Sequence, residues 1–210
     1  MKKGVIFDLD GTLINSMKVW ENADFTLAEK YGFRPDKEYW NTVTSCSFLE
    51  GASYITKRFN LGKSSREIAD ELYSIALNDY RHNIKLKPGA KLLLERLNRD
   101  GIKMAIATSN VEEMTHAVLK KNGVFGYFKA FAYCDCVGKN KAYPDVYNEA
   151  AKAIGLKANE CYVFEDVPYA LEGAKKAEVI GVYDEYSADK ESEMRQKADR
   201  YIMRLDEFNY

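Results

Sequence analysis

Short apolar runs occur at the start of the chain and throughout its second half, and most are followed by a stretch with helical periodicity. Four stretches carry apolar residues at every third or fourth position and are predicted helices: Gly89–Asp100, Val111–Asn122, Asp145–Ile154 and Val167–Ala177. Strands that alternate with helices predict a parallel sheet covered on both faces, and the right-handed rule for strand–helix–strand units favours a doubly wound α/β fold. The predicted strands are Gly4–Leu9, Ile102–Ala107, Ala130–Tyr133, Cys161–Phe164, Val179–Val182 and Arg200–Met203.

A helical segment interrupts this alternation directly after the first strand. Turn-forming residues separate three amphipathic stretches within it, at Val19–Tyr31, Phe48–Phe59 and Ser65–Tyr80. We therefore expect two domains, an α/β core formed by residues 1–15 and 84–210 and a helical cap formed by residues 16–83. Because ligands bind beyond the carboxyl ends of the strands in open α/β sheets, this cap is expected to cover the site as a lid.

The composition is that of a globular protein and argues against several classes of partner. Lys and Arg total 31 against 32 Asp and Glu, so the net charge of −1 gives no reason to expect nucleic acid or an anionic membrane as a partner. No stretch approaches the roughly 18 consecutive apolar residues of a membrane span, and the apolar run after Gly4 is too short for a signal peptide. We expect a cytoplasmic protein, with a monomer as the default state.

Two carboxylates close the first predicted strand, in the sequence Asp8-Leu9-Asp10-Gly11-Thr12. Burying both without a cation would be costly. One interpretation is a Mg²⁺ site, because Mg²⁺ prefers hard oxygen ligands and keeps water and substrate phosphate in its shell. The alternative is a solvated turn whose carboxylates cap nearby backbone N–H groups.

Polar residues also follow the second and third predicted strands. Thr108-Ser109-Asn110 leads into a helix, so its hydroxyl and N–H groups suit either phosphate oxygens or an ordinary helix cap. A basic turn after the third strand carries Lys139 and Lys141, and either lysine could offset phosphate charge.

A second acidic pair, Glu165-Asp166, closes the fourth predicted strand. Because a helix starting at Val167-Pro168 follows, the pair could also be a helix cap. The carboxyl ends of parallel strands share one edge of a sheet, and four independent caps explain this joint occurrence poorly. The strand ends therefore predict a common site.

These strand ends resemble the haloacid dehalogenase (HAD) superfamily, and the resemblance covers essentially the whole chain. The helical insert is similar to the small cap of the subgroup that includes β-phosphoglucomutase and phosphoglycolate phosphatase. The family's four motifs are matched in order by Asp8-Leu9-Asp10-Gly11-Thr12-Leu13, by Thr108-Ser109-Asn110, by Lys141 ahead of Tyr143-Pro144-Asp145, and by Glu165-Asp166 followed by Gly173-Ala174.

The resemblance implies a role for each matched residue. Asp8 would be the nucleophile that forms an aspartyl-phosphate, and Asp10 the general acid/base. Mg²⁺ would be held by the Asp8 carboxylate, the Asp10 backbone carbonyl and Asp166, with Glu165 nearby. The substrate phosphate would be held by Thr108 and Lys141, with further contacts from Gly11, Ser109 and Asn110. Lys141 is favoured over Lys139 because it keeps the family's register relative to Pro144-Asp145.

The resemblance favours a Mg²⁺-dependent phosphatase that acts on a small phosphorylated metabolite, such as a sugar phosphate. A sugar-phosphate mutase is the alternative, but Trp20 stands where β-phosphoglucomutases carry a cap histidine, and Ser45–Gly51 lacks their arginine-bearing loop. Asp10 argues against a dehalogenase, and a non-catalytic phosphate-binding module is a further alternative. The cap aromatics Trp20, Trp40, Phe48 and Tyr54 are assigned to core packing rather than substrate contact.

Overall fold

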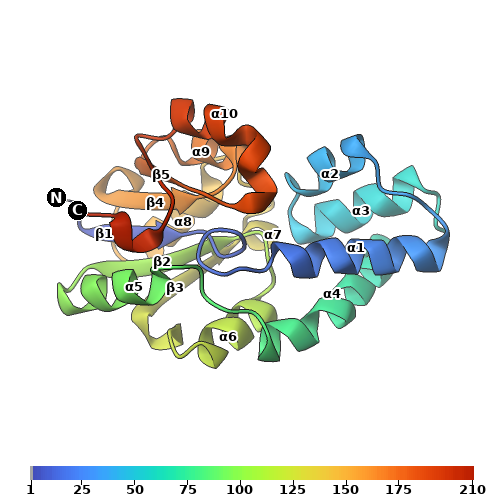
Figure 1. Ribbon diagram of the computed structural model, residues 1–210, viewed down its shortest axis with the longest axis horizontal. Coiled ribbons are helices and arrows are strands. Elements are labelled where there is room, and N and C mark those ends of the chain that lie inside the picture. The colour runs from blue at the N-terminus through green and yellow to red at the C-terminus, as the bar shows by residue number, and fades with distance from the viewer. Residues whose placement is uncertain (1) are drawn as a thin grey trace.

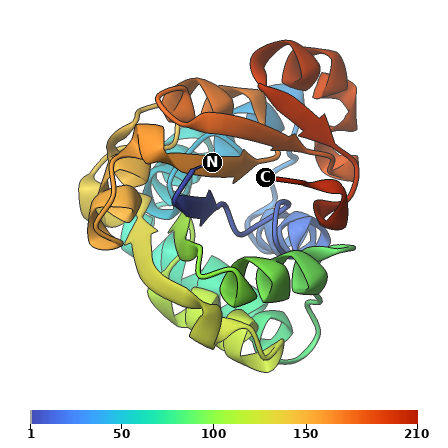
Figure 2. The same cartoon turned by 90° about the vertical axis from the view of Figure 1, so that its left-hand side faces the viewer.

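The chain folds around a parallel sheet whose six strands run in the order β3-β2-β1-β4-β5-β6. The computed structural model describes residues 2–210. Helices cover both faces of the sheet, as Figures 1 and 2 show, so the predicted doubly wound α/β fold is confirmed. All six predicted strands are present, with ends shifted by at most two residues: β1 (Gly4–Phe7), β2 (Lys103–Thr108), β3 (Phe128–Tyr133), β4 (Cys161–Glu165), β5 (Glu178–Val182) and β6 (Arg200–Ile202).

Successive side chains of each strand point to opposite faces of the sheet and belong to two separate apolar clusters, one on each face. In β1, Val5 and Phe7 join one cluster and Ile6 joins the other. The first cluster packs against α5 (Ala90–Arg99) and α6 (Glu112–Lys121). The second packs against three helices on the opposite face, α8 (Asp145–Ala153), α9 (Pro168–Ala174) and α10 (Glu191–Lys197).

Residues 17–82 form a block of four helices that we call the helical block. It has an apolar cluster of its own, centred on the fully buried Tyr39 and Leu27. Capping boxes start two of its helices, at Ser47 and at Ser64. The helices are α1 (Met17–Tyr31), α2 (Lys37–Val43), α3 (Phe48–Arg58) and α4 (Ser65–His82).

Two short helices were not predicted from the sequence. Seven-residue α2 follows a turn-rich stretch and is held by the Asp36 side chain, which accepts from the backbone N–H of Tyr39 (2.8 Å). The single turn α7 (Cys134–Val137) ends at Gly138, which has the left-handed φ of 71°. Both helices are too short to show a periodic pattern. No helix within residues 2–210 is long and apolar enough to cross a bilayer.

The strand order reverses direction at β1, which lies between β2 and β4. The chain enters the helical block just after β1 and returns from it close to the same point. Figure 1 shows the block at the carboxyl edge of the sheet. Gly11 turns the chain here with φ of 83°, and a Cβ at this position would collide with the Asp166 carboxylate. The fold therefore places its switch point, where open α/β sheets bind ligands, directly against the helical block.

Candidate active site

A cavity of about 380 Å³ lies between the carboxyl ends of the central strands and the helical block. Gly11 does not line it, but its lack of a side chain leaves room for the Asp166 carboxylate that does. The strand-end wall of the cavity contains the other eight predicted site residues: Asp8, Asp10, Thr108, Ser109, Asn110, Lys141, Glu165 and Asp166.

Lys141 is the lysine that reaches the strand ends. Its side chain is buried, and Nζ donates to Asp8 Oδ1 and to Glu165 Oε1 (2.8 Å). Lys139 instead lies at the surface, with Nζ 3.6 Å from an Asp145 oxygen. Gly173 permits this arrangement, because a Cβ there would collide with the carbonyl oxygen of Lys141. Burial acts to lower the pKa of Lys141, but Asp8 and Glu165 outweigh it and hold that pKa well above the ordinary value.

Asp8, Glu165 and Asp166 form a buried carboxylate cluster, with one oxygen from each within 4.8 Å of the others. Glu165 Oε1 also accepts from the Tyr147 hydroxyl (2.7 Å), and Asp166 Oδ1 accepts from Thr12 Oγ1 (2.9 Å). Burial is the main cause that raises the pKa of all three carboxyl groups, and the pKa of Glu165 reaches about 8. Repulsion adds to this effect: from Asp10 at Asp8, from Asp8 at Glu165, and from Asp8 and Glu165 at Asp166.

A divalent cation fits this carboxylate cluster. Within the described residues, Asp8 Oδ2 and Glu165 Oε2 are buried oxygens that accept no hydrogen bond. Lys141 supplies one positive charge against three carboxylates, so the cluster as it stands cannot ionise fully at low cost. Hard oxygen donors of this kind are the ligands that Mg²⁺ prefers.

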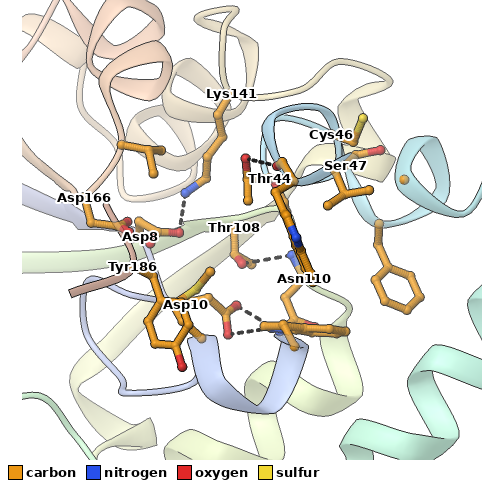
Figure 3. A pocket seen from close by; sticks show the side chains of 18 of the residues that line it. Asp8, Asp10, Thr44, Cys46, Ser47, Thr108, Asn110, Lys141, Asp166 and Tyr186 are labelled. Carbon is orange, nitrogen blue, oxygen red and sulfur yellow. Dashed lines mark hydrogen bonds and ion pairs between the residues drawn. The ribbon is translucent and has the colours of Figure 1, made fainter. Parts of the chain in front are cut away.

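Asp10 lies apart from this cluster and is held by neutral donors. Its Oδ1 accepts from Ser16 Oγ (2.6 Å), from the Tyr80 hydroxyl and from Trp20 Nε1 (3.3 Å). Its Oδ2 accepts from the Asn110 amide (2.9 Å), so this amide faces Asp10. Figure 3 shows the separation: Asp8 is bonded to Lys141, whereas Asp10 meets a different group of side chains.

Four of the side chains that orient these carboxylates were not among the predicted site residues. Tyr147 and Thr12 contact the carboxylate cluster, and Ser16 and Tyr80 contact Asp10. Tyr80 lies 70 residues from Asp10 in the chain. A tyrosine at the end of an amphipathic helix carries no local pattern that separates it from core packing.

The wall opposite the strand ends comes from the helical block. The assignment of the cap aromatics to the core holds for Tyr54, but Trp20, Trp40 and Phe48 both pack against apolar clusters and line the cavity. The block is also bonded to the core beside the cavity. Ser47 Oγ donates to Asp135, and the Tyr169 hydroxyl donates to the carbonyl oxygen of Thr44 (2.6 Å).

The sequence was compared with protein families and with individual proteins of known function. A sequence profile described as haloacid dehalogenase-like hydrolase matches residues 5–182. The chain is 34% identical to hexitol phosphatase A of Escherichia coli (strain K12) over 170 residues, which cover 79% of this chain and 75% of that protein. It is 24% identical to a phosphorylated carbohydrates phosphatase of Thermotoga maritima over 181 residues, which cover 86% and 84% of the two chains.

Among solved structures, the β-phosphoglucomutase from Clostridium difficile matches this chain with a TM-score of 0.84. The match covers 100% of this chain and 94% of that one, at 21% sequence identity. At this level of identity the likeness concerns the fold alone.

Proposed function

Because the chain belongs to the haloacid dehalogenase-like hydrolase family, we propose that it is a Mg²⁺-dependent phosphatase that hydrolyses small phosphomonoesters through an aspartyl-phosphate on Asp8. The family match and the named phosphatases among its relatives confirm the predicted enzyme class, a HAD-like phosphatase. The observation that carries the finer proposal is the buried contact of Lys141 with Asp8, beside two further carboxylates.

In this proposal Mg²⁺ would be held by Asp8, Asp166 and the backbone carbonyl of Asp10, with Glu165 nearby. When bound, the ion offsets the charge of both the carboxylates and the substrate phosphate. Lys141 neutralises part of the same charge, since a phosphate dianion and a carboxylate nucleophile otherwise repel each other. Thr108 and Ser109 supply hydroxyl groups to the phosphate oxygens.

In the first step an Asp8 oxygen attacks phosphorus and the ester P–O bond breaks, while Asp10 gives its proton to the leaving alcohol oxygen. In the second step Asp10 takes a proton from water, the water oxygen attacks phosphorus, and the bond to Asp8 breaks. Inorganic phosphate is released and Asp8 is regenerated. Asn110 and Tyr80 hold the Asp10 carboxylate in one orientation for both transfers.

The helical block serves as the cap in this proposal, with residues 16–83 as the cap domain and residues 1–15 and 84–210 as the core. The bonds from Ser47 to Asp135 and from Tyr169 to Thr44 hold it over the cavity. A closed cap excludes bulk water while the leaving alcohol departs.

The test is phosphate release from a panel of phosphomonoesters by the wild-type protein and by Asp8→Asn, each with Mg²⁺ and with excess EDTA. We expect release by the wild type that requires Mg²⁺ and is absent in the variant. Release that persists in Asp8→Asn would overturn the nucleophile assignment. Conversion of sugar phosphates to isomers without free phosphate would instead support the mutase.

A further inference from the structure

The wall of the cavity that the helical block supplies is mainly aromatic and apolar, and its described residues include no lysine or arginine. Among the described residues that line the cavity, the lysines are Lys141 and Lys190, and both belong to the core. Two carboxylates, Glu21 and Asp24, are the charged groups on the opposite wall. The apolar and aromatic side chains of that wall are Met17, Trp20, Trp40, Val43, Phe48, Ala52, Ile55 and Leu72.

The two carboxylates on this wall differ in how their charge is compensated. Glu21 is paired with Lys18, whose Nζ lies 2.6 Å from its Oε2, and the same oxygen accepts from the Tyr186 hydroxyl. Asp24 is 9% exposed and has one neutral partner, the Tyr39 hydroxyl, which donates to Oδ1 (2.6 Å). Its Oδ2 has no hydrogen-bond donor among the described residues and is not fully enclosed, so it is open to the cavity that Asp24 lines.

Burial raises the pKa of Asp24 to about 6, even though the Tyr39 hydrogen bond acts to lower it. Asp24 is therefore a largely buried carboxyl group with one neutral donor and no counter-ion among the described residues. Ionisation of such a group is costly unless its charge is compensated. A cation that reaches Oδ2 from the cavity would compensate it.

The rings beside Asp24 suit the same cation. Trp20 lies one helical turn before Asp24 in α1 and therefore on the same face. Phe48 packs edge-on against Trp20, with ring centroids 5.7 Å apart, and Trp40 completes this side of the lining. Aromatic rings attract cations through their electron-rich faces, and most strongly where water is excluded.

We propose that this wall binds an ammonium group of the substrate, whose N–H donates to Asp24 Oδ2 while the phosphate lies at Asp8 and Lys141. The inference rests on the proposed phosphatase function, because it takes the phosphate site as given. The preferred substrates are then zwitterions, the phosphomonoesters of amino alcohols or of amino-substituted polyols. A hydroxyl group of a neutral polyol phosphate can donate a hydrogen bond to Asp24 Oδ2, but it leaves the charge of the carboxylate uncompensated.

The test compares substrates that differ in charge but not in shape. Aminoalkyl phosphates of increasing chain length are each paired with the alkyl phosphate in which a methyl group replaces the ammonium. Phosphorylcholine paired with 3,3-dimethylbutyl phosphate separates attraction by the rings from an N–H bond to Asp24. The measurement is kcat/KM for phosphate release at neutral pH with Mg²⁺.

We expect the wild type to favour the aminoalkyl member by about tenfold or more at the chain length that reaches Asp24, since a charge-assisted hydrogen bond supplies an effect of that size. In Asp24→Asn the ratio within that pair should fall toward one. Glu21→Gln is the matched control and should keep the wild-type ratio, because Glu21 is already paired with Lys18.

Equal kcat/KM within every pair in the wild type would overturn the ammonium site, whether or not the variant folds, and would leave the phosphatase proposal intact. An unchanged ratio in a folded Asp24→Asn protein would also overturn it. Failure of the wild type to release phosphate from any ester would instead refute the underlying phosphatase proposal. A preference confined to phosphorylcholine would contradict the N–H bond to Asp24.

Discussion

Asp8 and Asp10 are separated by one residue at the end of β1, yet their carboxylates lie in opposite kinds of surroundings. Charged groups surround Asp8, with Lys141 bonded to it and Glu165 and Asp166 beside it. Asp10 is bonded to neutral donors alone among the described residues. The difference matches the proposed roles. A nucleophile that meets a phosphate dianion needs compensating charge, whereas a group that gives and takes a proton needs a fixed position.

The largest expected effect is the loss of kcat on substitution of Asp8 or Asp10, and its dependence on the leaving group should differ between the two residues. Asp8→Asn should lower kcat by at least about 10⁴-fold, roughly 5.5 kcal/mol, equally for p-nitrophenyl phosphate and for alkyl phosphates. Asp10→Asn should lower it far more for alkyl phosphates, whose leaving oxygen must be protonated, than for the acidic nitrophenol. Single-turnover kinetics with both esters measures this. If both variants lost the same factor in kcat with both esters, the proposed difference in role between Asp8 and Asp10 would be wrong.

Lys141→Met tests the role of compensating charge around Asp8. Removing the lysine leaves two buried carboxylates without a counter-charge, so we expect about a 10³-fold loss of kcat, roughly 4 kcal/mol. The free energy of unfolding in EDTA should fall by about 3–5 kcal/mol. Lys139→Met is the matched control. Its exposed pair with Asp145 should contribute less than about 1 kcal/mol. A milder effect at Lys141 than at Lys139 would contradict the assignment.

Asp24 differs from both Asp8 and Asp10, because it has no cationic partner and a single hydrogen-bond donor, the Tyr39 hydroxyl. Its pKa is raised from 3.8 to about 6 in the folded protein, so folding favours the protonated form. Its cost to stability is therefore absent well below pH 4, grows between about pH 4 and about pH 6, and is constant above that range. Asp24→Asn should raise the free energy of unfolding by roughly 1.5 kcal/mol at about pH 5 and roughly 3 kcal/mol at about pH 8. Urea titrations at both pH values measure the difference, and a pH-independent gain would contradict the shift.

The smallest effect should come from the donors to Asp10. Tyr80→Phe removes one of its hydrogen bonds and leaves the ring against Trp20, so we expect about a tenfold loss of kcat, roughly 1.4 kcal/mol. If Tyr80 positions the acid/base, the loss should be greater for alkyl phosphates than for p-nitrophenyl phosphate. Tyr73→Phe, in the same helix, is the control. A loss that is equal for both esters would indicate a purely structural role.

The strands and their polar ends could be predicted because each depends on local sequence. A strand buried on both faces of a parallel sheet must be an apolar run, and a carboxylate directly after it, such as Asp8 or Glu165, is conspicuous. The register of the resemblance relative to Pro144-Asp145 likewise favours Lys141 over Lys139. The close approach of α9 to Lys141, which Gly173 allows from more than 30 residues away along the chain, carries no such local signal.

The partners of Asp10 and the lining of the cavity could not be predicted in the same way. Tyr80 and Trp20 lie on amphipathic helices, and whether a ring on such a face fills the core or lines a cavity depends on how the helices pack. Trp20 does both. Asp24 falls among apolar neighbours in α1, and its missing counter-charge becomes visible only when the surrounding elements are in place.

The first described residues and the last residues of the chain lie at the side of the sheet opposite the helical block, as Figures 1 and 2 show. Near the start of the chain, Lys3 pairs with Glu160, just before β4. Near its end, Arg200 in β6 donates to the carbonyl oxygen of Asn209. A fusion partner or surface linker at either end would therefore project away from the cavity. Immobilisation through either end would therefore leave the helical block and the cavity beneath it on the side away from the support.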